Sequence, residues 1–143
     1  MIRRIPNTIP YMLGTFAIAV GLGVSAPTAS AASLAQEADI NNRLLEIAVA
    51  DEIRKSCDVI SPRIFTAWRR MQALKAEAIA RGYTEAEIEA YVNDKDEKRK
   101  MRARSDAYVR EHEAEPNDAQ SLCRLGKEEI AKQSRIGSLL VAR

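Results

Sequence analysis

The chain has 143 residues, of which 46% are hydrophobic, 5% aromatic and 29% charged. This length suits one domain with one modest core. The formal net charge is +2, and both excess positive charges are the arginines at positions 3 and 4, so the rest of the chain lacks the basic excess that is typical of a nucleic-acid-binding protein.

Residues 1–31 have the three regions of an export signal. The two arginines give a positive start, residues 11–24 are uncharged and mostly apolar, and Ala29-Ser30-Ala31 supplies the small residues that a signal peptidase recognises. The apolar run is shorter than the roughly 20 residues of a spanning helix. We therefore expect a cleaved signal peptide, a mature chain that begins at Ala32, and a periplasmic protein without stable membrane insertion. Retention of the segment as an N-terminal anchor is the alternative.

The mature chain has helical spacing from its start. Ser33 and Gln36 have the spacing of a capping box, and the apolar residues that follow predict a helix over residues 34–60, with Cys57 near its end. Ser61-Pro62 suits the start of a second helix, or a kink in one bent helix.

The second helix is expected to end at Gly82, a residue suited to the left-handed conformation that follows many helices. Its buried face is predicted from apolar spacing. The residues expected on that face are Ile64, Trp68 (or Ala67), Met71, Leu74 and Ala78.

The next helix has the clearest local signal in the chain. Thr84 and Glu87 form a capping box, and Tyr83 and Ile88 form a hydrophobic staple, so a helix begins at Glu85. It is predicted to continue through a nearly all-polar stretch, residues 93–104, and to end before Pro116.

The C-terminal part is expected to hold a short helix, capped by Asn117 or Asp118 and reaching Leu125, and a final helix over residues 127–141. Gly126 either ends the short helix or marks a close contact within one longer helix. No segment alternates as a strand does. The predicted fold is all-α, an irregular four-to-five-helix bundle formed by residues 32–143.

Cys57 and Cys123 are the only cysteines. In an oxidising compartment they are expected to form a structural disulfide, which would enclose two helices and add about 4 kcal/mol in the chain-entropy model. Two buried free thiols or an intermolecular bridge are the alternatives. The spacing excludes a Cys-x-x-Cys redox motif and haem attachment.

No pattern in the sequence indicates catalysis. His112 is the only histidine and lacks spaced partners, so we assign it no role. The acidic residues Glu85, Glu87, Glu89, Glu111, Glu113 and Glu115 are weighed as a glycosidase or metal site, and we assign them no such role. The first three lie in the opening turn of the third helix, where negative charge suits the positive end of the helix dipole. We find no phosphate-binding loop, nucleophile elbow or zinc spacing, and we expect no enzymatic activity, cofactor or metal.

A basic cluster in the polar stretch is the best candidate for a docking surface. Acidic residues flank it and interleaved aromatic residues are absent, so it does not resemble a nucleic-acid surface. It forms either a docking site for an anionic partner or a solvated face. Its members are Lys98, Arg99, Lys100, Arg102 and Arg104.

Several stretches resemble a family of small exported proteins of unknown function from the rhodobacterial branch of the alphaproteobacteria. They are residues 40–45, residues 49–57, Gly82-Tyr83-Thr84-Glu85-Ala86-Glu87-Ile88, and Cys123-Arg124-Leu125-Gly126 with residues 136–140. The resemblance implies export, helices, paired cysteines, and genes near those of the respiratory NADH dehydrogenase. It implies no catalytic residues.

Three functions remain open at this point. The first is a non-catalytic periplasmic accessory or assembly factor that acts on an envelope protein and is linked to a respiratory-chain complex. The second is a small stress chaperone that exposes apolar surface when acid protonates its carboxylates. The third is an unusual envelope enzyme, which would need a cleft lined by perturbed carboxylates.

Overall fold

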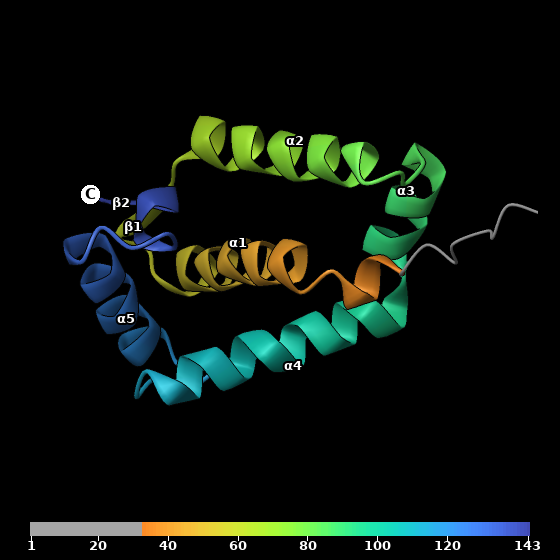
Figure 1. Cartoon of the computed structure of the whole chain (residues 1–143). Helices are drawn as coiled ribbons and strands as arrows, with labels where there is room; N and C mark the ends of the chain where they lie inside the picture. Colours follow the sequence, from red (N-terminus) through yellow and green to blue (C-terminus); the bar gives the residue numbers. More distant parts are fainter. Residues whose placement is uncertain (1–32) are drawn as a thin grey trace, which may run out of the picture.

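A computed structural model describes residues 33–143 (Figure 1). The expected signal peptide, residues 1–31, lies outside the described residues. Helix α1 (Ala38–Ser56) lies in the middle, between α2 (Ile64–Ala80) and α4 (Lys95–Glu111). Helix α3 (Glu85–Asn93) joins α2 to α4 at one end of α1, and α5 (Ala119–Ala131) packs at the other end. The expectation of a mostly helical chain is confirmed.

The first helix is shorter than predicted. A 3₁₀ turn, η1 (Leu34–Gln36), precedes α1, and the Ser33 side chain makes no cap hydrogen bond. The buried side chain of Asn41 instead donates to the carbonyl oxygens of Leu34 (2.8 Å) and Glu37 (2.9 Å). These bonds hold η1 against α1 without a continuous helix.

Two short strands stand where helix was expected. Strand β1 (Ile60–Pro62) pairs antiparallel with β2 (Leu140–Ala142), with Ser61 opposite Val141. The extended conformation that proline favours in the preceding residue suits a strand as well as a helix start, and tertiary pairing decides between the two. Helix α2 therefore begins at Ile64, after the N-cap residue Arg63.

Helix α2 faces α1 with a different side from the predicted one. Leu74 and Ala78 are buried as expected, and Ala67 packs against the core. Trp68, by contrast, is 58% exposed. The prediction was wrong for Ile64, Trp68 and Met71, which are all exposed. Two adjacent stripes of α2 are apolar, and only one can face α1.

The predicted third helix is divided in two. Helix α3 begins at Glu85 with the predicted capping box between Thr84 and Glu87, and Gly82 has the expected positive φ of 97°. The helix then ends at Asn93, because Asp94 takes an extended conformation and its carboxylate caps α4, accepting from the backbone N–H groups of Asp96 and Glu97. Aspartate competes with a continuous helix in this way.

The C-terminal helices also differ from the prediction. Helix α5 runs through Gly126 to Ala131, capped by the Asp118 carboxylate, which accepts from the Ser121 backbone N–H (2.8 Å). The helix expected over residues 127–141 is absent from the described chain: after α5 come a loop, the 3₁₀ turn η2 (Gly137–Leu139) and β2. Of the two interpretations of Gly126, the close contact within a longer helix is confirmed.

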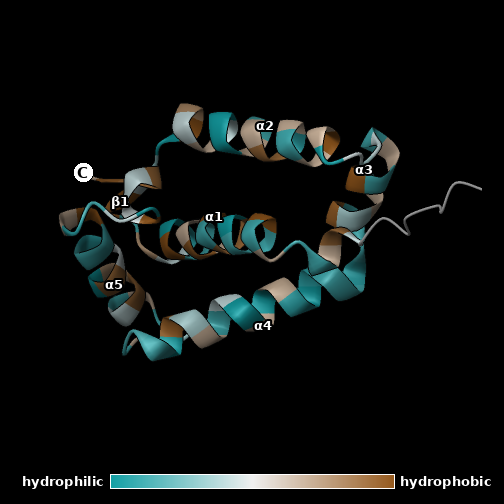
Figure 2. Ribbon diagram, in the orientation of Figure 1, coloured by the Kyte–Doolittle hydropathy of each residue, from teal (hydrophilic) through white to brown (hydrophobic). Residues whose placement is uncertain are grey.

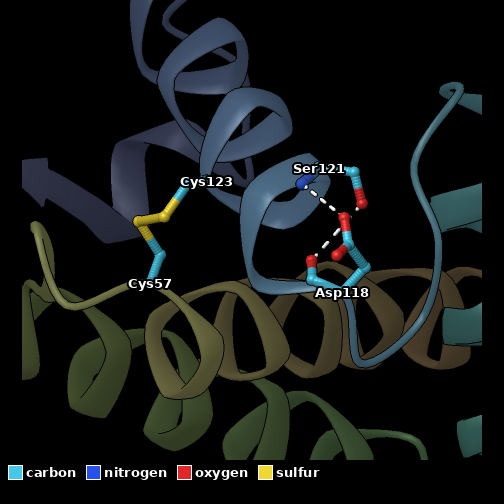
Figure 3. Close-up of a disulfide and its surroundings, with 4 residues drawn as sticks. All are labelled: Cys57, Asp118, Ser121 and Cys123. Atoms are coloured by element: carbon cyan, nitrogen blue, oxygen red, sulfur yellow. Dashed lines mark hydrogen bonds between the residues drawn. A yellow bond between two sulfur atoms is a disulfide. The ribbon is translucent and has the colours of Figure 1, made fainter.

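The predicted disulfide joins Cys57, at the end of α1, to Cys123 in α5 (Figure 3). Their Cα atoms are 5.1 Å apart. The covalent loop encloses α2, α3 and α4, three helices where two were expected, because of the break at Asp94. Cys57 is fully buried, so the bridge lies in the main core.

The buried residues form two clusters along α1. The larger lies at the disulfide end and includes Ile53, Leu122 and Leu125. The smaller, which includes Ile40 and Leu74, lies near the turn between α2 and α3. Between them, the face of α1 that carries Leu44, Ile47 and Ala48 is only half-buried, and α3 joins α2 to α4 at one end of α1 (Figure 1).

Candidate docking groove

A groove lies over the uncovered face of α1, bordered by α2, α3 and α4. It has a volume of about 280 Å³, close to the lower end of the range for small-ligand pockets. Its lining is mostly apolar, with three charged residues. The lining residues are Leu44, Ile47, Ala48, Asp51, Met71, Tyr91, Val92, Glu97, Lys98 and Met101.

The groove continues along α1 and α4 into a second, more polar hollow of about 480 Å³. Ala48, Asp51, Lys98 and Met101 line both hollows. The second hollow adds Lys55 and the buried Glu52. The surface formed by the two hollows is therefore apolar at one end and charged at the other.

Helix α3 accounts for the width of the groove. Its capping box starts it within a few residues of the end of α2, and Asp94 stops it after nine residues. The hydroxyl of Tyr91 donates to the side-chain oxygen of Asn41, which holds α3 against α1 beside the groove. Burial raises the pKa of Tyr91, so this hydroxyl remains a donor.

The acidic residues of the groove are already paired within the chain. Asp51 accepts from Arg54 and Lys55, each at 2.5 Å. Glu97 accepts from the Lys100 ammonium at 2.6 Å. The charge that remains for a partner in the groove is therefore positive.

The predicted basic docking cluster is divided by the structure. Arg99, Lys100, Arg102 and Arg104 all bind polar groups of their own chain. Lys98 is the cluster member that lines the apolar hollow, and Arg102 lines the second, more polar one. Arg99 pairs with Asp96, Lys100 with Glu97, Arg102 with Asp106 (3.0 Å), and Arg104 donates to the Asn42 side chain (2.8 Å). Within residues 33–143 we find no ion pair to Lys98. Helix α4 is mostly hydrophilic along its length (Figure 2).

Other residues singled out in the sequence have structural roles. Glu87 completes the capping box, and Glu85 pairs with Lys75 at 3.0 Å. The Nδ1 atom of His112 lies 2.8 Å from the Tyr108 carbonyl oxygen, and its ring stacks on that of Tyr108.

One group of titratable side chains lies near His112. Burial, together with the negative charge of Glu129, raises the pKa of Tyr108 to about 12. The buried Glu129 also accepts from Ser134, and the Ser134 hydroxyl in turn accepts from the Gly137 N–H (2.9 Å). These contacts hold the segment after α5 in place.

Sequence reasoning missed the groove itself. Apolar spacing predicts burial of Val92 in the first turns of the third helix, whereas Val92 is exposed and lines the groove. Met101 is an isolated apolar residue in a polar run, so spacing did not select it. Both line a hollow formed with residues of α1 and α2, a proximity that the sequence does not display.

No set of three or more His, Cys, Asp or Glu side chains in residues 33–143 is arranged to hold a metal ion. No helix in the same range is long and apolar enough to cross a membrane.

Comparison with curated proteins and with solved structures finds no significant match to this chain. A family model does match, and it covers residues 32–141. The match includes both cysteines, every helix of the structure and the groove. The chain therefore belongs to a family of unknown function, DUF5333.

Proposed function

We propose that this protein is a non-catalytic, exported accessory or assembly factor that binds another envelope protein through the groove over α1. The observation that carries the proposal is the apolar lining of the groove together with Lys98, which has no ion-pair partner within the described residues. Buried apolar contacts supply most of the affinity of such a site, and a charge at the rim selects the partner.

The cysteine pair supports export. Disulfides persist in oxidising compartments such as the periplasm and are rare in the cytosol, and the bridge between Cys57 and Cys123 lies in the main core. The resemblance to exported proteins of rhodobacterial lineage makes respiratory-chain complexes the first partners to test.

Site-specific photo-crosslinking in intact cells tests the proposal. A photoreactive amino acid replaces Met101 or Val92 in the groove, and Lys127, an exposed residue of α5, is the matched control position. We expect both groove positions to yield the same adduct, identified by mass spectrometry as one envelope protein, and Lys127 to yield none. A Lys98→Glu substitution should reduce the adduct severalfold in a protein with an unchanged circular dichroism spectrum.

Two results would reject this function. Equal adducts from Lys127 and the groove positions would indicate non-specific contact. Absence of any protein adduct at Met101 and Val92, with the crosslinker shown to be incorporated, would leave the groove without a protein partner.

An acid-responsive chaperone is the second candidate, and a cluster of ion pairs favours it. Arg81 binds Glu37, Asp39 and Glu77, and Arg43 also binds Glu77. These contacts tie the start of α1 to the end of α2, over the smaller core. Protonation of the carboxylates would loosen this end and expose Leu74 and its neighbours. Because these pKa values are lowered, the expected result for this function is suppression of client aggregation that grows as the pH falls from about 5 toward about 3 and is absent at neutral pH.

A further inference from the structure

The outer side of α2 carries an apolar surface that the groove does not account for. Phe65 is 84% exposed, Ile64 69% and Trp68 58%. Ile79, near the other end of the helix, is 45% exposed. Of the α2 residues, only Met71 lines the groove, so this surface points elsewhere.

The exposed residues follow a pattern with mirror symmetry in the sequence. Phe65, Trp68, Gln72, Ala76 and Ile79 are all exposed, and their spacings are three, four, four and three residues. These spacings keep one stripe on a helix of 3.6 residues per turn. Gln72 is at the centre, with Phe65 and Ile79 each seven residues away.

This symmetry is the requirement for an antiparallel pair of identical helices. In a two-fold interface, when one residue contacts a second, the second contacts the first in return. With the axis at Gln72, Phe65 meets Ile79 of the second copy, and Trp68 lies over the small Ala76 of the second copy. The two Gln72 side chains meet at the axis, where paired polar residues fix the register of helix pairs.

The area is sufficient for self-association. With about 150–250 Å² for each large side chain, the exposed parts of Ile64, Phe65, Trp68 and Ile79 amount to roughly 500 Å². That is about two thirds of the ~800 Å² that each partner contributes to a standard interface. It also lies near the upper end of the range for the largest apolar patch of a typical monomer, ~300–600 Å².

The charges beside the stripe permit the arrangement. Arg69 and Lys75 lie at the same level of the antiparallel pair, three residues before and after Gln72, but on opposite flanks of the helix, at 100° per residue. Lys75 is also paired with Glu85. The positive charges of the two copies therefore do not face one another.

We infer that the outer face of α2 is the interface of a two-fold homodimer in which two α2 helices pack antiparallel about Gln72. This dimer is independent of the proposed partner groove, because the stripe and the groove lining have no residue in common.

Sedimentation velocity of the full chain with its disulfide intact, over a hundredfold concentration range, tests this inference. We expect a reversible change from monomer to dimer. Trp68 is the only tryptophan, so its emission should shift to shorter wavelength over the same concentrations. Phe65→Glu should weaken the association by more than about tenfold, because it removes a large aromatic contact and buries a charge in its place. Val92→Glu, at an exposed residue of the groove, is the matched control and should leave the dimer unchanged.

Single cysteines test the geometry independently of affinity. With oxidised glutathione as oxidant, Gln72→Cys should give a covalent dimer. Phe65→Cys should give none, because fourteen residues of helix, about 21 Å, separate it from the same position in the second copy. Ala73→Cys is exposed but faces away from the stripe and should also give none.

Several results would overturn the inference. A monomer throughout the concentration range, a dimer unaffected by Phe65→Glu, or crosslinking as rapid at Ala73→Cys as at Gln72→Cys would each do so. A monomer that binds vesicles of anionic phospholipid through Trp68 would also overturn it. So would a monomer in which residues 1–31 cover Trp68, so that its emission lies at short wavelength at every concentration.

Discussion

Gly126 and Gly137 lie where a methyl group would collide with the rest of the chain. A Cβ atom on Gly137 would lie 1.9 Å from the Glu129 carbonyl oxygen, which belongs to the backbone of α5. A Cβ atom on Gly126 would lie 2.5 Å from Ile53 Cγ2 and from Ile60 Cδ1. The first obstacle is backbone and the second consists of side-chain ends, so the two collisions differ in how easily they relax.

Alanine substitution at these two glycines should therefore have unequal effects. Overpacking of a core costs about 1–3 kcal/mol, and Gly137→Ala should reach or exceed the upper value because η2 must move away from α5. Gly126→Ala should lower the unfolding free energy less, because the higher helix propensity of alanine offsets about 1 kcal/mol of the overpacking cost. Urea unfolding of both variants measures the difference. An equal loss of unfolding free energy in the two variants would contradict this account.

Residues whose partners are near in sequence were predictable. The Thr84–Glu87 capping box and the positive φ of Gly82 depend on a few adjacent positions, and both predictions are confirmed. The close approach of Gly137 to Glu129 arises from packing after a loop. In the sequence this glycine indicates only lower helix propensity, so its structural role was not predictable.

At the scale of elements, the disulfide holds α1 and α5 together and encloses the three helices between them. Closing a loop of 66 residues removes chain entropy worth about 4 kcal/mol from the unfolded state. Replacing both cysteines with alanine should lower the unfolding free energy by about that amount in urea titrations. Reduced wild-type protein is the control for lost side-chain packing and should lose a similar amount. A loss of less than about 1 kcal/mol in the reduced wild type would show that the chain-entropy account fails here.

Elements that depend on a distant partner were predicted wrongly. Leu140 and Val141 fit a helix or a strand, and pairing with Ser61 and Pro62 makes them β2. Helix α2 presents two apolar stripes, one with Leu74 and Ala78 and the other with Ile64, Trp68 and Met71. Apolar spacing in a sequence cannot rank such stripes, because both have the helical period. Which stripe is buried is decided by contact with α1.

At the scale of the whole molecule, the groove is a product of how the helices are spaced. The sequence predicted a basic cluster on one polar helix, and those residues do lie on α4. It could not predict that Lys98 would face Met71 and Tyr91 across the same hollow, because these residues come from three helices. The candidate site therefore depends on α3, whose length follows from two local caps.

The cluster that joins α1 to α2 should make the stability of the molecule depend on acid pH. The side chains that face one another there are Arg43, Arg81, Glu37, Asp39, Glu77 and the hydroxyl of Tyr83. The Arg81 guanidinium holds the pKa of Asp39 below its usual value, and Arg43, then Arg81, lower the pKa of Glu77. A carboxylate with a lowered folded-state pKa stabilises the fold above its unfolded pKa. This stabilisation is lost as the pH falls through the folded pKa.

We therefore expect the unfolding free energy to be constant near neutral pH and to decrease below about pH 5. Arg81→Gln should be less stable than the wild type at pH 7, and the difference should shrink as the pH falls toward 3, because acid removes the same interactions in the wild type. Arg99→Gln, which breaks the exposed pair with Asp96, is the control and should change little at any pH. Urea titrations at several pH values measure these differences. A gap between wild type and Arg81→Gln that stays constant with pH would assign the role of Arg81 to packing, and would remove the support that this cluster gives to an acid-responsive chaperone.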